Sequence, residues 1–179
     1  MKYLLILTAI LSSLLTFSSA YSQEDPDIPR TPMVVLDWDN NIIVHEQGIL
    51  SGQDAILAVD PKFFTGAKRN GLIAMENNIY SFADQDALAQ FDANEDSIID
   101  EGDAIYQYLY LIHFLTSGKM KVVSLKVAGI RAIILKGHED PIKSASQTAH
   151  ADDIGYVILS SNTTLPLRII NVRTSYFRK

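Results

Sequence analysis

The stretch Asp92-Ala-Asn-Glu-Asp-Ser-Ile-Ile-Asp-Glu-Gly-Asp103 decides the predicted fold, because its acidic residues recur at the spacing of a helix–loop–helix calcium site. A loop of this type takes oxygen ligands from positions 1, 3, 5, 7, 9 and 12. With Asp92 at position 1, the candidate metal ligands are Asp92, Asn94, Asp96, Ile98, Asp100 and Asp103. Ile98 would contribute only its backbone carbonyl, so its apolar side chain is no objection. The spacing therefore predicts Ca²⁺ as a cofactor of this loop.

The four carboxylates among these ligands would repel one another without an ion. Two charges about 5 Å apart at an effective dielectric constant near 20 cost about 3 kcal/mol, and a divalent cation would remove that cost. Two positions depart from the preferred pattern: Ser97 stands at position 6, where Gly is favoured, and Asp103 replaces the bidentate Glu at position 12. The alternative is an acidic loop that binds no metal and precedes a helix whose dipole favours negative charge.

The segments on either side of the loop are expected to be helices. The segment from Asp84 to Phe91 opens on a residue type that caps helix N-termini well. The segment from Asp103 to Gly118 places Ile105, Leu109 and Ile112 at spacings of four and three, and it ends on a residue that favours a C-terminal cap. The loop and its flanks together predict an EF-hand-like helix–loop–helix.

Short apolar and β-branched stretches elsewhere predict β-strands. They occupy residues 33–37, 55–59, 121–127, 130–135, 154–159 and 165–176, whereas 71–75 and 79–82 suit either a strand or a packed turn. The predicted fold class is therefore α+β, with the EF-hand-like unit flanked by short strands that form a small sheet.

The N-terminal residues predict export. Residues 1–20 have the features of a signal peptide: a lysine near the start, an apolar run, and small residues that end at Ala20. The apolar run is short for a membrane helix, so we expect cleavage and no membrane span afterwards. Residues 21–32 resemble a flexible, proline-punctuated linker, and residues 33–179 a single α+β domain that contains the calcium loop at 92–103. The chain has no cysteine, which suits a secreted or periplasmic bacterial protein held by packing and metal.

Charge is distributed unevenly along the chain. Residues 21–103 contain 17 acidic and 4 basic residues, a net charge of −13, whereas residues 104–179 contain 4 acidic and 10 basic residues, a net charge of +6. An exported protein-binding or surface-binding module is therefore the alternative function, with Arg168 and Arg173 of the basic C-terminal sheet meeting an unidentified partner and the metal incidental. The acidic balance and the lack of a basic, aromatic stripe argue against a nucleic-acid partner.

Catalytic motifs are absent from the sequence, and we expect no enzymatic activity. The four histidines are scattered, at His45, His113, His138 and His150. His138 is followed by Glu139 but not by the second histidine of a helical zinc site. The sequence also has no nucleophile elbow and no phosphate-cradling glycine loop.

Four stretches follow one another in a suggestive order: Val34-Val-Leu-Asp-Trp-Asp39, Ala87-Leu-Ala-Gln-Phe-Asp-Ala-Asn-Glu-Asp96, Asp103-Ala-Ile-Tyr106 and Gly129-Ile-Arg-Ala-Ile133. In this order they resemble an EF-hand-like module of RTX-type (repeats-in-toxin) and hemolysin-like secreted bacterial proteins. The resemblance implies a calcium-stabilised accessory or binding module with one intact loop. A second loop that begins at residues 37–41 is degenerate, because Gly48 falls where the twelfth-position ligand belongs. The glycine-rich nonapeptide repeats of the toxins do not occur in the sequence.

Overall fold

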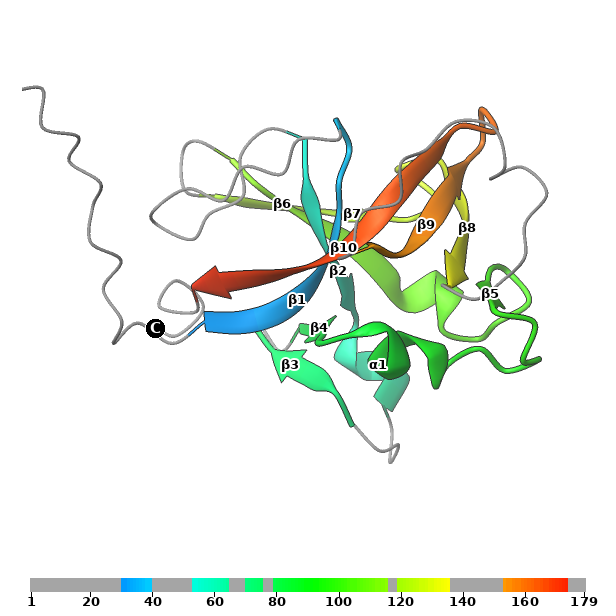
Figure 1. The fold of residues 1–179 in the computed structure, drawn as a ribbon, viewed down its shortest axis with the longest axis horizontal. Coiled ribbons are helices and arrows are strands. Elements are labelled where there is room, and N and C mark those ends of the chain that lie inside the picture. The colour runs from blue at the N-terminus through cyan, green and yellow to red at the C-terminus, as the bar shows by residue number, and fades with distance from the viewer. Residues whose placement is uncertain are drawn as a thin grey trace, which may run out of the picture.

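The computed structural model describes residues 30–39, 53–64, 70–75, 79–115, 119–135 and 153–173, and within them β-strands dominate (Figure 1). The strands are β1 (Arg30–Leu36), β2 (Ala55–Val59), β3 (Leu72–Ala74), β4 (Tyr80–Phe82), β5 (Ile98–Ile99), β6 (Leu109–Phe114), β7 (Met120–Ser124), β8 (Ile130–Leu135), β9 (Asp153–Leu159) and β10 (Thr164–Arg173). The helical elements are α1 (Gln85–Ala89) and the 3-10 helices η1 (Pro61–Phe64) and η3 (Tyr106–Tyr108). None of the helices in these ranges has the length and apolar character needed to cross a membrane. The predicted signal peptide lies outside the described residues, and β1 begins within the last residues of the predicted linker.

The strands form one antiparallel sheet around β2. The order is β3-β4-β2-β1-β10-β9-β8-β5. Outside this order, β6 pairs with β2, and β7 pairs with β6. Ala55 and Ile56 of β2 pair with β1, while Ala58 and Val59 pair with β4. The stretch from Ile56 to Val59 also pairs with β6. Because β2 hydrogen-bonds to neighbours on both edges and is buried at every position, it is the central strand of the molecule.

The α+β fold class predicted from the sequence is wrong. The chain forms a ten-stranded sheet, and α1, which has five residues, is the α-helix of the described ranges. The predicted second helix, from Asp103 to Gly118, is instead η3 followed by β6. Leu109 and Leu111 pack in one apolar cluster and Ile112 packs in another, as alternate residues of a strand do. A strand buried on both faces is apolar throughout, so spacings of three and four occur in it as they do in a helix.

Other elements agree with the sequence. All six predicted strand segments overlap β1, β2, β7, β8, β9 and β10, and the two ambiguous segments form β3 and β4. The first predicted helix is α1, and the Asp84 carboxylate accepts the Ala87 backbone N–H at 2.8 Å as its N-cap. These segments were predictable because their signals are local.

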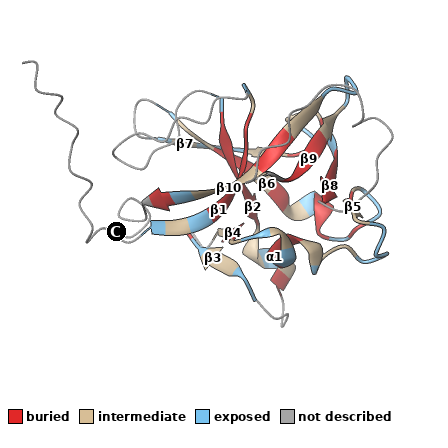
Figure 2. Cartoon of the chain, viewed as in Figure 1, coloured by how far each residue is buried: buried red, intermediate tan, exposed pale blue. Residues whose placement is uncertain are grey.

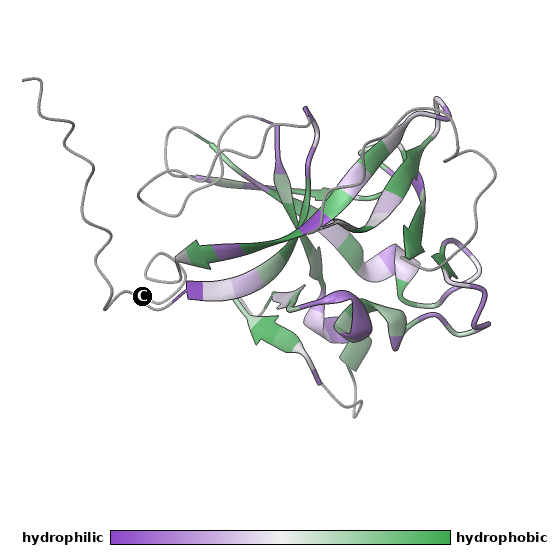
Figure 3. Ribbon diagram, in the orientation of Figure 1, coloured by the Kyte–Doolittle hydropathy of each residue, from purple (hydrophilic) through white to green (hydrophobic). Residues whose placement is uncertain are grey.

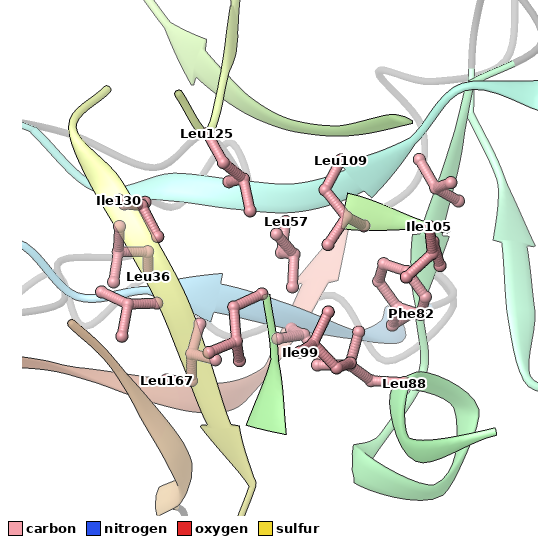
Figure 4. Close-up of a cluster of buried hydrophobic side chains, with 14 of the residues drawn as sticks. Leu36, Leu57, Phe82, Leu88, Ile99, Ile105, Leu109, Leu125, Ile130 and Leu167 are labelled. Carbon is pink, nitrogen blue, oxygen red and sulfur yellow. The ribbon is translucent and has the colours of Figure 1, made fainter. Parts of the chain in front are cut away.

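Two apolar clusters lie on the two faces of the central strands. The main core joins β2 to α1, β5 and β8, and Figure 4 shows Leu57, Leu88, Ile99 and Ile130 converging in it. The second cluster contains Met33, Val35, Ile56, Ala58, Met75, Ile112 and Val172. Figure 2 shows burial concentrated where the strands cross, and Figure 3 shows hydrophobic residues along the same strands. Each large side chain buried there stabilises the fold by about 1.5–3 kcal/mol.

Gly155 of β9 gives a test of the sheet. A methyl group at this position would meet the backbone carbonyl oxygen of Ile134 in β8, and the backbone of a paired strand cannot easily move away. We expect Gly155→Ala to lower the free energy of unfolding by about 3 kcal/mol, measured by urea denaturation. Gly129→Ala is the control, because Gly129 also has a positive φ, +74°, but the nearest atom to the added methyl group, Ser160 Oγ, would be 3.9 Å away. The cost of Gly129→Ala should be about 1 kcal/mol. Equal losses in the two variants would contradict the close β8–β9 approach.

Candidate functional site

The loop from Asp92 to Asp103 leaves α1 and returns to the sheet through β5. Three of its carboxylates accept hydrogen bonds from backbone N–H groups further along the same loop. These bonds run to Asp92 Oδ2 from Ser97 (2.7 Å), to Asp96 Oδ1 from Ile98 (2.8 Å) and to Asp100 Oδ1 from Gly102 (2.7 Å). The loop is therefore folded around its own acidic side chains.

Two residues of the loop have a left-handed backbone conformation. Glu95 and Ser97, at positions 4 and 6, have φ angles of +58° and +65°. This left-handed conformation is the reason that Gly is favoured at position 6. Ser97 thus adopts the expected conformation without being Gly, at the cost of some backbone strain.

Asp103, at position 12, closes the loop. Its side chain is buried, with Oδ1 accepting the N–H of Ala93 at 2.8 Å and Oδ2 accepting the N–H of Asp100 at 3.1 Å. The predicted ligand at position 12 therefore already joins the first turn of the loop to its last. This clamping role was not predicted from the sequence.

Ile98 and Ile99 tie the loop to the sheet. The Ile98 N–H donates to Asp96, whereas the Ser97 carbonyl accepts the N–H of Leu135 at the end of β8. In an extended residue the N–H and C=O point to the same side, so the Ile98 carbonyl faces the loop, as position 7 requires. Ile99 is fully buried in the main core (Figure 4), and its backbone pairs with Ile133 of β8.

The remaining loop oxygens are not gathered around one point. Asn94 Nδ2 donates to Asp96 Oδ2 at 2.8 Å, so these two side chains are adjacent. Asp92 Oδ1 is buried and has no hydrogen-bond partner within the described part of the chain. The loop carboxylates are not among the acidic groups of the described ranges whose oxygens lie within 4.8 Å of one another. The six predicted ligand residues thus lie in one loop, but the four aspartates among them accept hydrogen bonds from backbone N–H groups and do not converge on one point.

A second acidic cluster lies where β1 ends and β2 begins. Asp37, Asp39 and Asp54, the aspartate trio, have oxygens that all lie within 4.8 Å of one another. The pairing of Leu36 with Ala55 places Asp37 opposite Asp54. The sequence indicated oxygens at Asp37 and Asp39, but it missed Asp54, which strand pairing alone brings to them. The signal that could have pointed to Asp54 is an aspartate directly before a buried strand. Gly48, which the sequence placed at the twelfth position of the degenerate loop, lies outside the described residues.

Burial and charge make the trio electrostatically unusual. Asp37 and Asp54 are buried and Asp39 is exposed. Burial raises the pKa of Asp54 to about 6, the hydrogen bond from the Trp38 N–H opposes this shift, and the charges of Asp37 and Asp39 add to it. Arg168 Nη1 lies 2.7 Å from Asp37 Oδ2 and is itself largely buried. Arg168, which the sequence suggested for docking a partner, is therefore engaged inside the fold; the Arg173 side chain is outside the described residues.

His113 is the histidine that lies within the described ranges. Burial lowers the pKa of its imidazole, and the nearby Lys121 lowers it further, while hydrogen bonds with the backbone of Gln53 and Asp54 oppose the shift. These contacts make His113 part of the packing between β6 and the start of β2. His45, His138 and His150 lie outside the described residues.

A family model described as the SPM domain matches residues 28–165. The chain belongs to the SPM-domain family. The matched SPM domain begins just before β1 and ends at the start of β10, so it includes both the acidic loop and the aspartate trio. No curated protein matches the chain. The description of the SPM domain names no ligand, so the resemblance to RTX-type modules stays a prediction.

The raised pKa of Asp54 predicts that the free energy of unfolding depends on pH when a metal chelator is present in the solution. The folded protein holds this proton up to about pH 6, whereas the ordinary value is 3.8. The protonated Asp54 carboxyl therefore contributes about 2–3 kcal/mol to the free energy of unfolding. This contribution is fully present below about pH 4 and is lost as the pH rises through about 6. The Asp54→Asn side chain cannot ionise. The free energy of unfolding of this variant, relative to that of the wild type, should therefore rise between pH 4 and pH 7. Urea denaturation measures both free energies at each pH. A difference between variant and wild type that stays constant from pH 4 to pH 7 would refute the raised pKa.

Proposed function

We propose that this SPM-domain protein is an exported, non-enzymatic calcium-binding protein whose ion occupies the loop from Asp92 to Asp103. The observation that carries the proposal is Asp92 Oδ1, a buried carboxylate oxygen without a hydrogen-bond partner in the described residues. It stands at position 1 of a loop that already has left-handed turns at positions 4 and 6. A buried acceptor left unpaired costs about 1–3 kcal/mol, and more when it is charged. A cation in the loop would remove that cost.

The loop can supply oxygens to an ion without refolding its backbone. Asp92 and Asp100 each have one oxygen bonded to a backbone N–H, and the other oxygen is available for a ligand bond. Asn94 and Asp96 are exposed, so their side chains are able to rotate inward. The Ile98 carbonyl adds a neutral oxygen from the sheet side. Calcium takes six to eight such oxygens at about 2.3–2.6 Å, with water completing the shell.

The ion would act mainly on stability. The loop is fixed at Ile99, which is buried in the main core, and at Asp103, which clamps its two ends. An ion that holds Asp92 and Asp96 together would thus also hold α1 to β5. Since the chain has no cysteine, an exported form of it would depend on packing and on any bound metal.

Calcium should raise the melting temperature of the protein. Extracellular sites of this kind have dissociation constants of about 10⁻⁴–10⁻³ M, so 10 mM Ca²⁺ should add about 1.4–2.7 kcal/mol to the free energy of unfolding. For a protein of this size, that gain corresponds to a rise of about 3–10 °C. Differential scanning calorimetry with Ca²⁺ and with a chelator measures it. Asp96→Ala should abolish the rise because it removes the position-5 ligand.

Glu101→Gln is the matched control for Asp96→Ala. It removes one negative charge from the same loop, but at position 10, which supplies no ligand, and Glu101 is exposed. The calcium response should therefore survive in Glu101→Gln. Asp103 is unsuitable for this comparison, because its replacement would break the clamp whether or not an ion binds. If calcium left the melting temperature of the wild-type protein unchanged, the proposal would fail.

A further inference from the structure

The aspartate trio, which is separate in sequence from the calcium loop, also contains a buried carboxylate oxygen without a hydrogen-bond partner among the described residues. Asp54 is 2% exposed, and its two carboxylate oxygens differ. Oδ1 accepts the Trp38 N–H at 3.1 Å, whereas Oδ2 is buried with no hydrogen-bond partner in the described ranges. Native proteins rarely leave such an oxygen unpaired, so this atom itself points to a missing partner.

Two neighbouring strands hold the trio in place. Asp37 follows β1 directly, its N–H donates to the Pro166 carbonyl of β10 at 3.1 Å, and its carboxylate pairs with Arg168. Asp54 directly precedes β2, opposite Asp37. Their geometry is therefore set by sheet pairing and not by a loose surface loop. Asp39 is exposed.

Asp54 is the member of the trio that carries the argument for a missing partner. Asp37 and Asp54 are both buried, and Arg168 pairs with Asp37. Ionised carboxylates are costly to bury unless they are paired. The Arg168 guanidinium contacts Asp37, and no comparable cation is seen at Asp54 Oδ2 within the described residues.

We propose that Asp37, Asp39 and Asp54 form a second metal site, which takes a hard divalent cation independently of the calcium loop. Two oxygens on opposite sides of an ion at about 2.4 Å from each are at most about 4.8 Å apart, and the trio meets this limit. The donors are carboxylate oxygens alone, which suits Ca²⁺, Mg²⁺ or Mn²⁺ better than softer metals. Water would fill the remaining positions of the coordination shell, since Asp39 is exposed.

Trp38 gives this site its own signal. It is the single tryptophan of the chain, it lies between Asp37 and Asp39, and its backbone N–H donates to Asp54 Oδ1. The test uses the full protein carrying Asp96→Ala, so that the calcium loop lacks a ligand. Ca²⁺, Mg²⁺ and Mn²⁺ are titrated separately, with tryptophan fluorescence and isothermal calorimetry as readouts. We expect a saturable change for at least one ion, with about one ion bound per chain.

Two further variants are made in the same Asp96→Ala background. Asp39→Asn should weaken binding at least tenfold, and because Asp39 is exposed its replacement should leave the fold intact. Asp86→Asn, which changes an exposed aspartate in α1, should leave the affinity unchanged. Circular dichroism verifies that each variant is folded. Asp54→Asn should also abolish binding while retaining the melting transition.

The outcomes separate this proposal from the calcium loop. Binding that survives Asp96→Ala and is lost with Asp39→Asn supports the second site, even if the calcium loop binds nothing. Binding in the wild type that Asp96→Ala abolishes completely, in a folded protein, overturns the second site and leaves the proposed function standing. Equal affinities in the Asp39→Asn and Asp86→Asn variants also overturn it.

Discussion

The burial of β2 between neighbours on both of its edges is the constraint on which the rest of the structure depends. Its residues alternate between the two apolar clusters, with Leu57 in the main core and Ile56 in the second. β1 and β4 pair with its two ends, and β6 runs along its other edge. Because β2 cannot shift without breaking all of these contacts, Asp54 is fixed opposite Asp37 at its start. The acidic trio is thus a consequence of the same pairing that builds the core.

The strands were largely predictable, whereas their assembly was not. Ala55–Val59 and Ile130–Leu135 are short and rich in β-branched residues, and this local signal is enough to indicate a strand. Leu109–Phe114 is also a strand, but its apolar residues face both clusters, so their spacing matched a helix equally well. The acidic loop before it favoured the helix, because a calcium loop is normally followed by one. The calcium-loop motif and the ambiguous spacing therefore both predicted a helix where the chain forms η3 and β6.

The two acidic clusters were predictable to different degrees for the same physical reason. The candidate ligand positions of the loop from Asp92 to Asp103 are set by local spacing, so the sequence alone is enough to propose them. The clamping role of Asp103 needs the folded loop, since its partners are the backbone N–H groups of Ala93 and Asp100. Asp54 could not be linked to Asp37 without knowing that β1 and β2 pair. Sites built within one loop are visible in a sequence, and sites built across strands are not.

The uneven charge of the chain ties these features together. Residues 21–103 carry a net charge of −13 and residues 104–179 a net charge of +6, yet Arg168 from the basic segment pairs with Asp37 of the trio. The loop lowers its own repulsion by giving each of its four aspartates at least one backbone N–H, which a loop can do because its backbone is free to turn. The trio is held by strand pairing, and its one printed bond of this kind runs from the Trp38 backbone N–H to Asp54 Oδ1. Each cluster thus keeps a buried carboxylate oxygen without a hydrogen-bond partner among the described residues, Asp92 Oδ1 in the loop and Asp54 Oδ2 in the trio, and a cation is the partner that we propose for each of them.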